Sequence, residues 1–285
     1  MYAGHSHGKG RPIQVGALLR FTAVLATSQA AFLVLAGCGP GGGSDIVQPR
    51  APDSTAAERA YRDPPAVETV TPVTGGRILL VGRADGRTRI RLAAPAGQAV
   101  FAQSSADGSW RIVLGGAPQL RLFGLSMIED GRALQAEGYL AVTPQGAAAQ
   151  LRAGSGAQVL SKSGAQRLLA VDFDRKGGTV ISGTGAPGAM VNVGVDGIQK
   201  GRIAVDRVGR FAFALDEPLS SGDHRLTLAG GGDPAEATVV VSPAEPLAPG
   251  PFRAAVTPSG WRIDWMTPGG GVQTTLLIAP QSARS

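Results

Sequence analysis

The chain is poor in the side chains that bind metals and form disulfides. It has one cysteine and three histidines among 285 residues. A single cysteine cannot form an intramolecular disulfide, and with so few histidines it has no partners for a zinc or iron site. His5 and His7 lie close to the N-terminus, which leaves His224 as the one histidine of the long remainder. We therefore expect neither a bound metal nor a cofactor.

Sequence motifs of the common enzyme classes are also missing. After Cys38 the chain has no G-x-S-x-G, S-x-x-K or H-E-x-x-H motif and no P-loop. A serine triad would depend on His224 as its only base. The sequence therefore indicates a protein that is not an enzyme.

Two groups of acidic residues have the composition that a glycosidase pair or a calcium site uses. They are Asp172 with Asp174 and the neighbours Asp216 and Glu217. Asp174 is followed by Arg-Lys-Gly-Gly, which favours a solvated turn over a calcium site. We therefore assign these acids no catalytic or metal-binding role.

The excess of positive charge is small once the N-terminus is set aside. Residues 1–37 hold three of the 27 basic residues and none of the 21 acidic residues, so 24 basic residues face 21 acidic ones in the remainder. Nucleic-acid binding requires a concentrated basic face. We therefore expect no nucleic-acid partner.

A hydrophobic segment from Phe21 to Leu35 follows a leader that contains Lys9, Arg11 and Arg20. The segment is shorter than the roughly 20 residues that a membrane-spanning helix needs. A basic leader followed by a short hydrophobic run is typical of a secretory signal peptide. We expect it to form a signal helix that is removed.

The hydrophobic segment ends in Leu35-Ala36-Gly37-Cys38. This motif resembles the lipobox of bacterial lipoproteins, in which an aliphatic residue, a small residue and Gly or Ala precede an invariant cysteine. The resemblance implies that residues 1–37 are cleaved off and that lipid is attached to the Cys38 sulfur. Acyl chains contribute about 0.8 kcal/mol per buried CH₂, which holds the protein on membrane lipid. An ordinary signal peptide with an incidental cysteine is the alternative.

Residues 38–71 are rich in glycine, proline, alanine and charge, and have little to bury. We expect these residues to form a flexible, disordered tether. A coil of about 30 such residues would reach roughly 30 Å on average. Gly39 rather than Asp follows the cysteine. In lipoproteins of Gram-negative bacteria this implies sorting to the outer membrane, on its periplasmic or surface face.

Beyond the tether, short segments rich in Val, Ile, Leu, Phe and Thr alternate with Gly, Pro and Asp-Gly. Thr88–Leu92 and Trp110–Leu114 carry apolar residues at alternate positions, which is the period of a strand with one wet face. No segment there keeps a convincing helical period. The sequence predicts an all-β sandwich or barrel.

An internal repeat indicates two copies of one module. Gly75–Gly82 aligns with Gly177–Gly183, and Gly108-Ser109-Trp110 aligns with Gly209-Arg210-Phe211. Gly108 follows Gly82 by 26 positions, and Gly209 follows Gly183 by the same 26. Two modules over residues 72–144 and 166–243, joined by a linker over 145–165, are the simplest account.

The second copy carries four motifs: ISGTGAPGAMV (181–191), VDG (195–197), DRVGRF (206–211) and LSSGDHRL (219–226). These resemble the bacterial immunoglobulin-like domains that occur in tandem in envelope and surface proteins. The resemblance implies two tandem immunoglobulin-like β-sandwich modules. Asp196-Gly197 suits a two-residue hairpin, and Phe211 or Trp110 fills a sandwich core. The first copy is more divergent and lacks the Pro-Gly pair and the late G-x-H.

Residues 244–285 are expected to form a linker and a C-terminal β-hairpin, with strands over 259–266 and 272–278. An isolated hairpin is marginal in water, so it should pair with an edge of one sandwich. Trp261 and Trp265 differ by four positions and share one face of a strand. They either seal the hairpin onto a core or form a stacking surface for a ligand.

These features predict a non-enzymatic, lipid-anchored protein of the cell envelope that presents immunoglobulin-like modules for protein interaction or scaffolding. The alternative is a carbohydrate- or peptidoglycan-binding envelope lipoprotein that uses Trp261 and Trp265. Buried rings would argue against this alternative, and exposed coplanar rings would favour it. The residues identify no particular envelope protein or glycan as the partner.

Overall fold

The computed structural model describes residues 62–160, 165–248 and 250–279. Every regular element within these ranges is a β-strand, which confirms the all-β class. The expected signal helix, the lipobox and most of the expected tether lie outside these residues. The last part of the expected tether, residues 66–71, instead belongs to the strand Ala66–Val73 of the first sandwich, where Val67 is buried. Among the residues described, none belongs to a helix that is long and apolar enough to cross a membrane.

The first ten strands form the N-terminal sandwich. One sheet has the order β1-β2-β5, and the other has the order β10-β9-β8-β6-β3-β4 with β7 paired to β6. The strands are β1 (Ala66–Val73), β2 (Arg77–Arg83), β3 (Arg89–Ala93), β4 (Ala99–Gln103), β5 (Ser109–Leu114), β6 (Arg121–Glu129), β7 (Arg132–Gln135), β8 (Tyr139–Val142), β9 (Ala148–Leu151) and β10 (Gln158–Val159).

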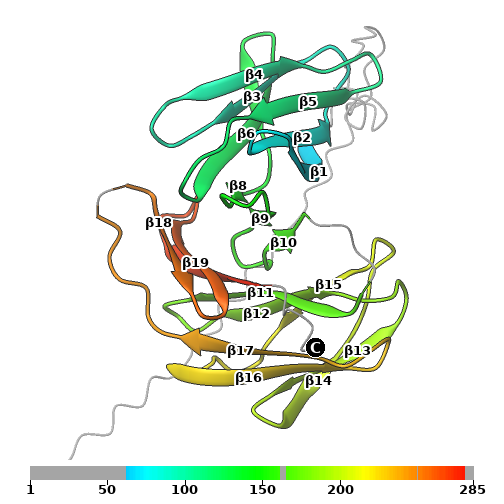
Figure 1. Cartoon of the computed structure of the whole chain (residues 1–285), viewed down its shortest axis with the longest axis vertical. Coiled ribbons are helices and arrows are strands. Elements are labelled where there is room, and N and C mark those ends of the chain that lie inside the picture. The colour runs from blue at the N-terminus through cyan, green and yellow to red at the C-terminus, as the bar shows by residue number, and fades with distance from the viewer. Residues whose placement is uncertain (1–61, 161–164, 249, 280–285) are drawn as a thin grey trace, which may run out of the picture. The chain divides into compact units, whose positions relative to one another are not determined.

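The remaining ten strands form the C-terminal sandwich. Its sheets have the orders β15-β12-β11-β20-β19-β18 and β14-β13-β16-β17, and Figure 1 shows them as two layers. The strands are β11 (Arg167–Asp174), β12 (Thr179–Thr184), β13 (Met190–Val195), β14 (Ile198–Ala204), β15 (Arg210–Ala214), β16 (Gly222–Ala229), β17 (Ala235–Val241), β18 (Phe252–Thr257), β19 (Gly260–Met266) and β20 (Val272–Ile278).

The two sandwiches repeat one strand topology. The order β1-β2-β5 in the first corresponds to β11-β12-β15 in the second, and β4-β3-β6 corresponds to β14-β13-β16. The first strand of each copy also carries a register shift, between Val67 and Thr69 and between Leu168 and Ala170. The repeat seen in the sequence is therefore a repeat of architecture, and the tandem sandwich modules are confirmed.

A glycine opposite an aromatic residue marks the same place in both copies. Gly82 pairs with Trp110, and Gly183 pairs with Phe211. A Cβ atom at Gly82 would lie 2.4 Å from a ring carbon of Trp110, and one at Gly183 would lie 2.5 Å from a ring carbon of Phe211. Each ring therefore covers a glycine, and both rings are buried. The glycine and the ring are 28 positions apart in both copies, so this cross-strand contact accounts for the equal spacing of the repeat.

The turn between β13 and β14 has the expected two-residue form. Asp196 and Gly197 have φ angles of 53° and 81°, and Val195 pairs directly with Ile198. Both central residues thus lie in the left-handed region that a type I′ turn requires.

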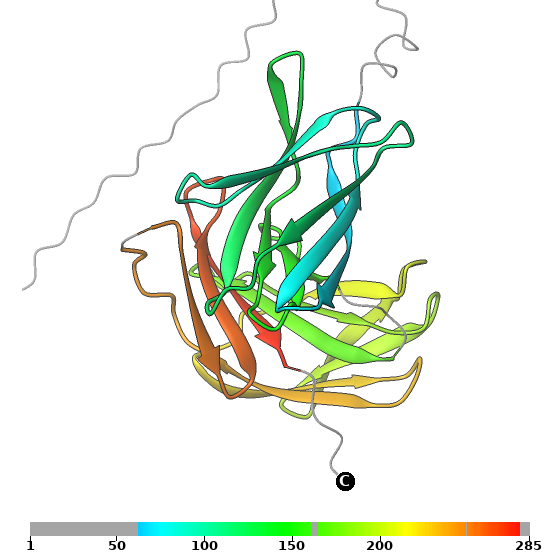
Figure 2. The same cartoon turned by 45° about the horizontal axis from the view of Figure 1, so that its top comes forward.

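The C-terminal segment pairs with the C-terminal sandwich, as expected. Strand β20 pairs with β11, and β19 pairs with β20. Figure 2 shows the three strands β18, β19 and β20, coloured orange to red. The structure has three strands here and not the two of the predicted hairpin, because β18 pairs with β19.

The segment expected to be a linker over 145–165 differs from the structure. Within it, β9 pairs with β8 and β10 pairs with β9, so the segment extends a sheet of the N-terminal sandwich. Ala148, Ala149 and Leu151 are buried. Small alanine side chains gave no strand signal in the sequence, but they allow close packing on both faces of this extension.

Candidate functional site

A buried apolar layer joins the two sandwiches, and we call it the junction layer. It is separate from the core inside each sandwich. One side comes from β6, β8, β9 and flanking residues, and the other from β11, β19 and β20. Its buried members are Leu120, Leu122, Ala141, Ala149, Leu151, Ala157, Ala170, Ile263, Trp265 and Leu277.

Trp265 is the largest side chain of the junction layer. Its ring is fully buried, and Nε1 donates a hydrogen bond of 3.1 Å to Oγ1 of Thr275. The ring of Tyr139 meets it edge-on, with centroids 5.8 Å apart and an interplanar angle of 82°. Trp265 thus uses both its apolar surface and its polar N–H inside the protein.

The stacking surface considered for the two tryptophans does not match this arrangement. Trp265 is fully buried, while Trp261 is only half-buried and packs at the margin of the junction layer. A ligand cannot stack on a ring that has no exposed face. The contacts of Trp265 correspond to the other interpretation, in which the hairpin is sealed onto a core.

A buried carboxylate lies beside the junction layer. Asp172 on β11 is 2% exposed. It accepts a hydrogen bond of 2.6 Å from the backbone N–H of Ala157, which belongs to the N-terminal sandwich. It also accepts hydrogen bonds from the side chains of Gln273 and Thr275 on β20. Three donors therefore converge on one carboxylate.

Gln273 also bonds to the loop before β10. Its Oε1 accepts a hydrogen bond of 3.0 Å from the N–H of Gly154, and its Nε2 donates to the carbonyl of Arg152 at 3.3 Å. We call the side chains of Asp172, Gln273 and Thr275, with the backbone groups of residues 152–157 that they bind, the clasp. The clasp therefore ties the β9–β10 loop of one sandwich to β11 and β20 of the other. Burial raises the pKa of Asp172 to about 6, although the hydrogen bonds from Thr275, Ala157 and Gln273 act to lower it.

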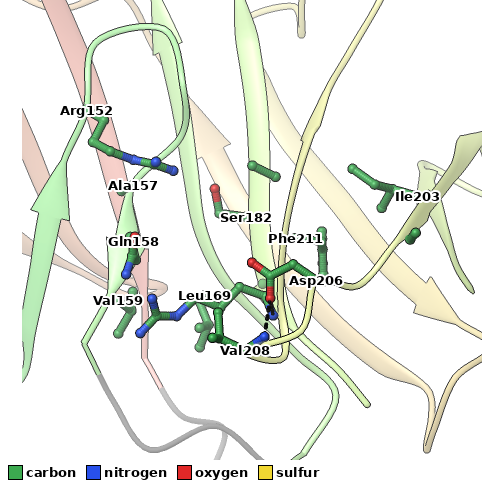
Figure 3. Close-up of a pocket in the computed structure, with 14 residues that line it drawn as sticks. Arg152, Ala157, Gln158, Val159, Leu169, Ser182, Ile203, Asp206, Val208 and Phe211 are labelled. Carbon is green, nitrogen blue, oxygen red and sulfur yellow. Dashed lines mark hydrogen bonds between the residues drawn. The ribbon is translucent and has the colours of Figure 1, made fainter. Parts of the chain in front are cut away.

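A cavity of about 360 Å³ opens next to the clasp. It is lined by the β9–β10 region and by residues of β11, β12, β14 and β15 with the turn before β15. Figure 3 shows Arg152, Gln158 and Val159 on one side, and Ser182 and Asp206 on the other. Asp206 caps the turn before β15, because its Oδ1 accepts hydrogen bonds from the N–H groups of Val208 and Arg210.

A second buried carboxylate fixes the C-terminal strands. Asp264 on β19 is 1% exposed and is held by Arg253, Arg262 and Thr274. Burial acts to raise its pKa, but these hydrogen bonds outweigh burial and lower it. Arg262 also donates to the hydroxyl of Ser242 at 2.6 Å, after the end of β17. The outermost strand β18 is thus anchored through Arg253 to the body of the sandwich.

His224 on β16 makes two hydrogen bonds that define its charge. Nδ1 lies 2.7 Å from Oδ2 of Asp196, and Nε2 lies 2.8 Å from the backbone carbonyl of Ser220. Both partners are acceptors, so both ring nitrogens carry a proton. Burial acts to lower the pKa of His224, but the bonds to Asp196 and Ser220 outweigh it and raise the pKa. A cationic imidazole on a backbone carbonyl is not a general base for a serine nucleophile.

The other acids singled out in the sequence lie apart from the cavity. Asp174 caps its own turn by accepting hydrogen bonds from the N–H groups of Lys176 and Gly178, in keeping with the predicted turn. Glu217 lies 3.7 Å from the Lys200 ammonium and is mostly exposed. Among the described residues, no group of three or more His, Cys, Asp or Glu is arranged to hold a metal ion. Cys38 and the cleavage residues Leu35, Ala36 and Gly37 lie outside the described residues.

Sequence reasoning missed the clasp and the cavity. The available signal was the lack of apolar–polar alternation in β11 and β20, RLLAVDFD and VQTTLLI, and the structure shows buried residues on both faces of these strands. Such strands are covered on both sides, whereas a strand with one wet face alternates. That pattern indicates that a second layer covers this sheet, and an acid within it has to find partners there.

Comparison with known proteins adds little. No protein-family model matches the chain, and no curated protein has a similar sequence. One solved structure, "Biofilm associated protein - BSP domain", is 15% identical over 64% of this chain and 30% of that chain, with a TM-score of 0.24. The chain thus spans less than a third of that structure's length.

A second solved structure is described as "Structural insight into host cell surface retention of a 1.5-MDa bacterial ice-binding adhesin". It is 10% identical over 76% of this chain and 88% of that chain, with a TM-score of 0.21. Both TM-scores are too low to establish a shared fold, so neither structure bears on what this chain does.

Proposed function

We propose that the chain is a lipid-anchored, non-enzymatic protein of the bacterial cell envelope whose sandwiches offer a strand edge to a protein partner. The lipobox at Leu35-Ala36-Gly37-Cys38 supports the anchor, and Gly39 supports the outer membrane as its location. The buried ionisable groups Asp172, Asp264 and His224 support a role without catalysis, because each is engaged in contacts that hold strands and loops together.

The observation that carries the interaction role is the strand β18. It is the last strand of a six-stranded sheet, so within the described part of the chain its outer edge has no neighbouring strand in that sheet. It also carries Val256, which is 72% exposed. An open edge with an exposed β-branched residue accepts an added strand from a partner. Anchoring through Asp264 keeps this edge in a fixed position.

The glycan-binding alternative has less support. It needed two exposed rings, and Trp265 is fully buried with its N–H already paired. Trp261 alone offers one partly covered ring. A protein partner at the β18 edge is therefore the better proposal.

Replacement of Cys38 by serine is expected to abolish acylation and membrane association. The wild type should yield a mature mass that begins at Cys38 and carries acyl chains, because only a thiol accepts the diacylglycerol group. Intact-mass measurement of membrane and soluble fractions checks this for both forms. An unacylated, soluble wild type would contradict the anchor and leave an ordinary signal peptide.

A photo-crosslinking residue at Val256 is expected to capture a discrete protein partner in cells. The same residue at Val208, which is 59% exposed in the turn before β15, is the matched control. Adducts at Val256 should be specific to that site, and should be lost in the Cys38→Ser form if the partner resides at the membrane. Equal labelling at both sites, or none at Val256, would contradict the edge-strand proposal.

A further inference from the structure

The cavity beside the clasp has an unbalanced charge. Its described lining contains two guanidinium groups, those of Arg152 and Arg210, and one carboxylate, that of Asp206. Arg152 is held in place by loop carbonyls: its Nε donates to Gly156 at 3.1 Å and its Nη2 to Ser155 at 3.2 Å. These neutral acceptors position the cation, and the nearby carboxylate of Asp172, which lies outside the lining, is the other charge that Arg152 acts on. The side chains that line the cavity themselves carry a net charge of one positive unit.

The pKa of Arg210 is affected by the second arginine of the lining. Burial lowers its pKa, the carboxylate of Asp206 acts in the opposite direction, and the positive charge of Arg152 lowers the pKa further. The two arginines thus lie close enough to disfavour each other. An anion between them would relieve that repulsion.

Ser182 supplies an independent sign of a missing partner. Its side chain is 4% exposed and lines the cavity, and its buried hydroxyl has no hydrogen-bond partner among the described residues. Buried hydroxyl groups are nearly always paired, and an unpaired one destabilises the fold. Gly156 lies directly above it, since a Cβ there would be 2.5 Å from Oγ of Ser182. The loop therefore closes over the hydroxyl without offering it an acceptor.

The rest of the lining is apolar. Val159, Leu169, Ile203 and Phe211 contribute to the walls. The volume of about 360 Å³ lies within the range of roughly 300–1,000 Å³ that small-ligand sites occupy. A small apolar body thus fits beside the polar groups.

We propose that this cavity binds a ligand that carries one carboxylate on a small apolar body. One negative charge makes the cavity neutral, whereas a doubly charged phosphate would leave an excess of negative charge beside Asp206. Guanidinium groups bind carboxylates through paired, charge-assisted hydrogen bonds. The ligand also gives the hydroxyl of Ser182 its partner. The walls come from both sandwiches, and Ala157 and Arg152 contribute both to the clasp and to the lining of the cavity.

The test is calorimetric titration of the full chain in detergent with three probes. N-acetyl-leucine presents a carboxylate on an apolar body, glucuronate presents a carboxylate on a polar body, and N-acetyl-leucine amide lacks the charge. We expect saturable binding of N-acetyl-leucine, weaker binding of glucuronate and none of the amide. Tighter binding of glucuronate than of N-acetyl-leucine would overturn the apolar body of the ligand. Equal binding of the amide, or no binding of either acid up to about 10 mM, overturns the proposal.

Two substitutions locate the binding. Arg210→Gln is expected to weaken binding about tenfold, the loss of one charge-assisted hydrogen bond. Arg202→Gln is the matched control, because Arg202 is exposed on β14 and does not line the cavity. Equal losses in both variants would mean a general effect of charge and would overturn the site.

Ser182→Ala separates binding from folding. Removal of an unpaired buried hydroxyl should raise the melting temperature of the free protein by about 2–4 °C. The same variant should bind the carboxylate probe more weakly. Gain of stability with loss of binding is the expected pair of results, and unchanged affinity overturns the role of Ser182 in the site.

Discussion

Replacement of Trp265 by alanine is expected to lower the free energy of unfolding by about 3–5 kcal/mol, the range for deletion of a large buried aromatic side chain. The indole is fully buried in the junction layer and meets Tyr139 edge-on. Its loss also frees Thr275, the residue that accepts its N–H and donates to Asp172 in the clasp. Urea unfolding followed by circular dichroism measures the change.

The matched control is Trp261→Ala, on the same strand and of the same chemistry. Trp261 is only half-buried, so its truncation removes less packed surface and should cost less than half as much. A weakened junction layer should also let the two sandwiches unfold in separate steps, seen as a split transition in Trp265→Ala alone. Equal losses for the two variants would contradict the central position of Trp265.

The features predicted from sequence are those set by local contacts. The strands 260–266 and 272–278 follow from apolar runs around a Pro-Gly-rich turn, and the Asp196-Gly197 turn follows from its two residues. The repeat was visible because Gly82 pairs with Trp110 as Gly183 pairs with Phe211. In each case the pattern and its structural cause lie within about 30 residues.

The features that could not be predicted depend on pairs far apart in the chain. Asp172 finds its donors at Ala157 and at Gln273, which is 101 positions away. Strand alternation put Asp172 and Asp174 on one face, but only Asp172 is covered by the β9–β10 loop. That region was predicted to be a linker because its short alanine-rich segments have little strand propensity of their own. They form strands because β9 pairs with β8. The candidate cavity is built from both sandwiches, so the sequence pattern could not predict it.

Stability is expected to fall with rising pH because of Asp172, the reverse of the usual behaviour of a carboxylate. Its folded-state pKa of about 6 exceeds the ordinary value of 3.8, so the folded protein binds this proton more tightly than the unfolded chain does. The contribution is complete below pH 3.8 and is lost as the pH rises through about 6. The shift corresponds to a loss on the order of 3 kcal/mol.

Comparison with Asp172→Asn isolates this effect from the other titrating groups. The amide cannot ionise, and its NH₂ group meets donors that point at the carboxylate, so the variant is destabilised at every pH. The difference in unfolding free energy between wild type and variant should be largest below pH 3.8 and should narrow from there by about 3 kcal/mol by pH 7. Urea titrations at a series of pH values measure it, and a constant difference would contradict the buried, proton-binding state of Asp172.

The variant Thr275→Val tests whether the hydrogen bond from Thr275 lowers the pKa of Asp172. The hydrogen bond from Thr275 acts to lower the pKa of Asp172, so its removal should raise that pKa further. The pH range over which stability is lost then moves upward from about 6. The hydrogen bonds from Ala157 and Gln273 likewise favour the ionised carboxylate, so the gain in stability on protonation comes from the relief of charge burial and not from these bonds. A range that moves downward in Thr275→Val would mean that this bond favours the protonated carboxyl instead.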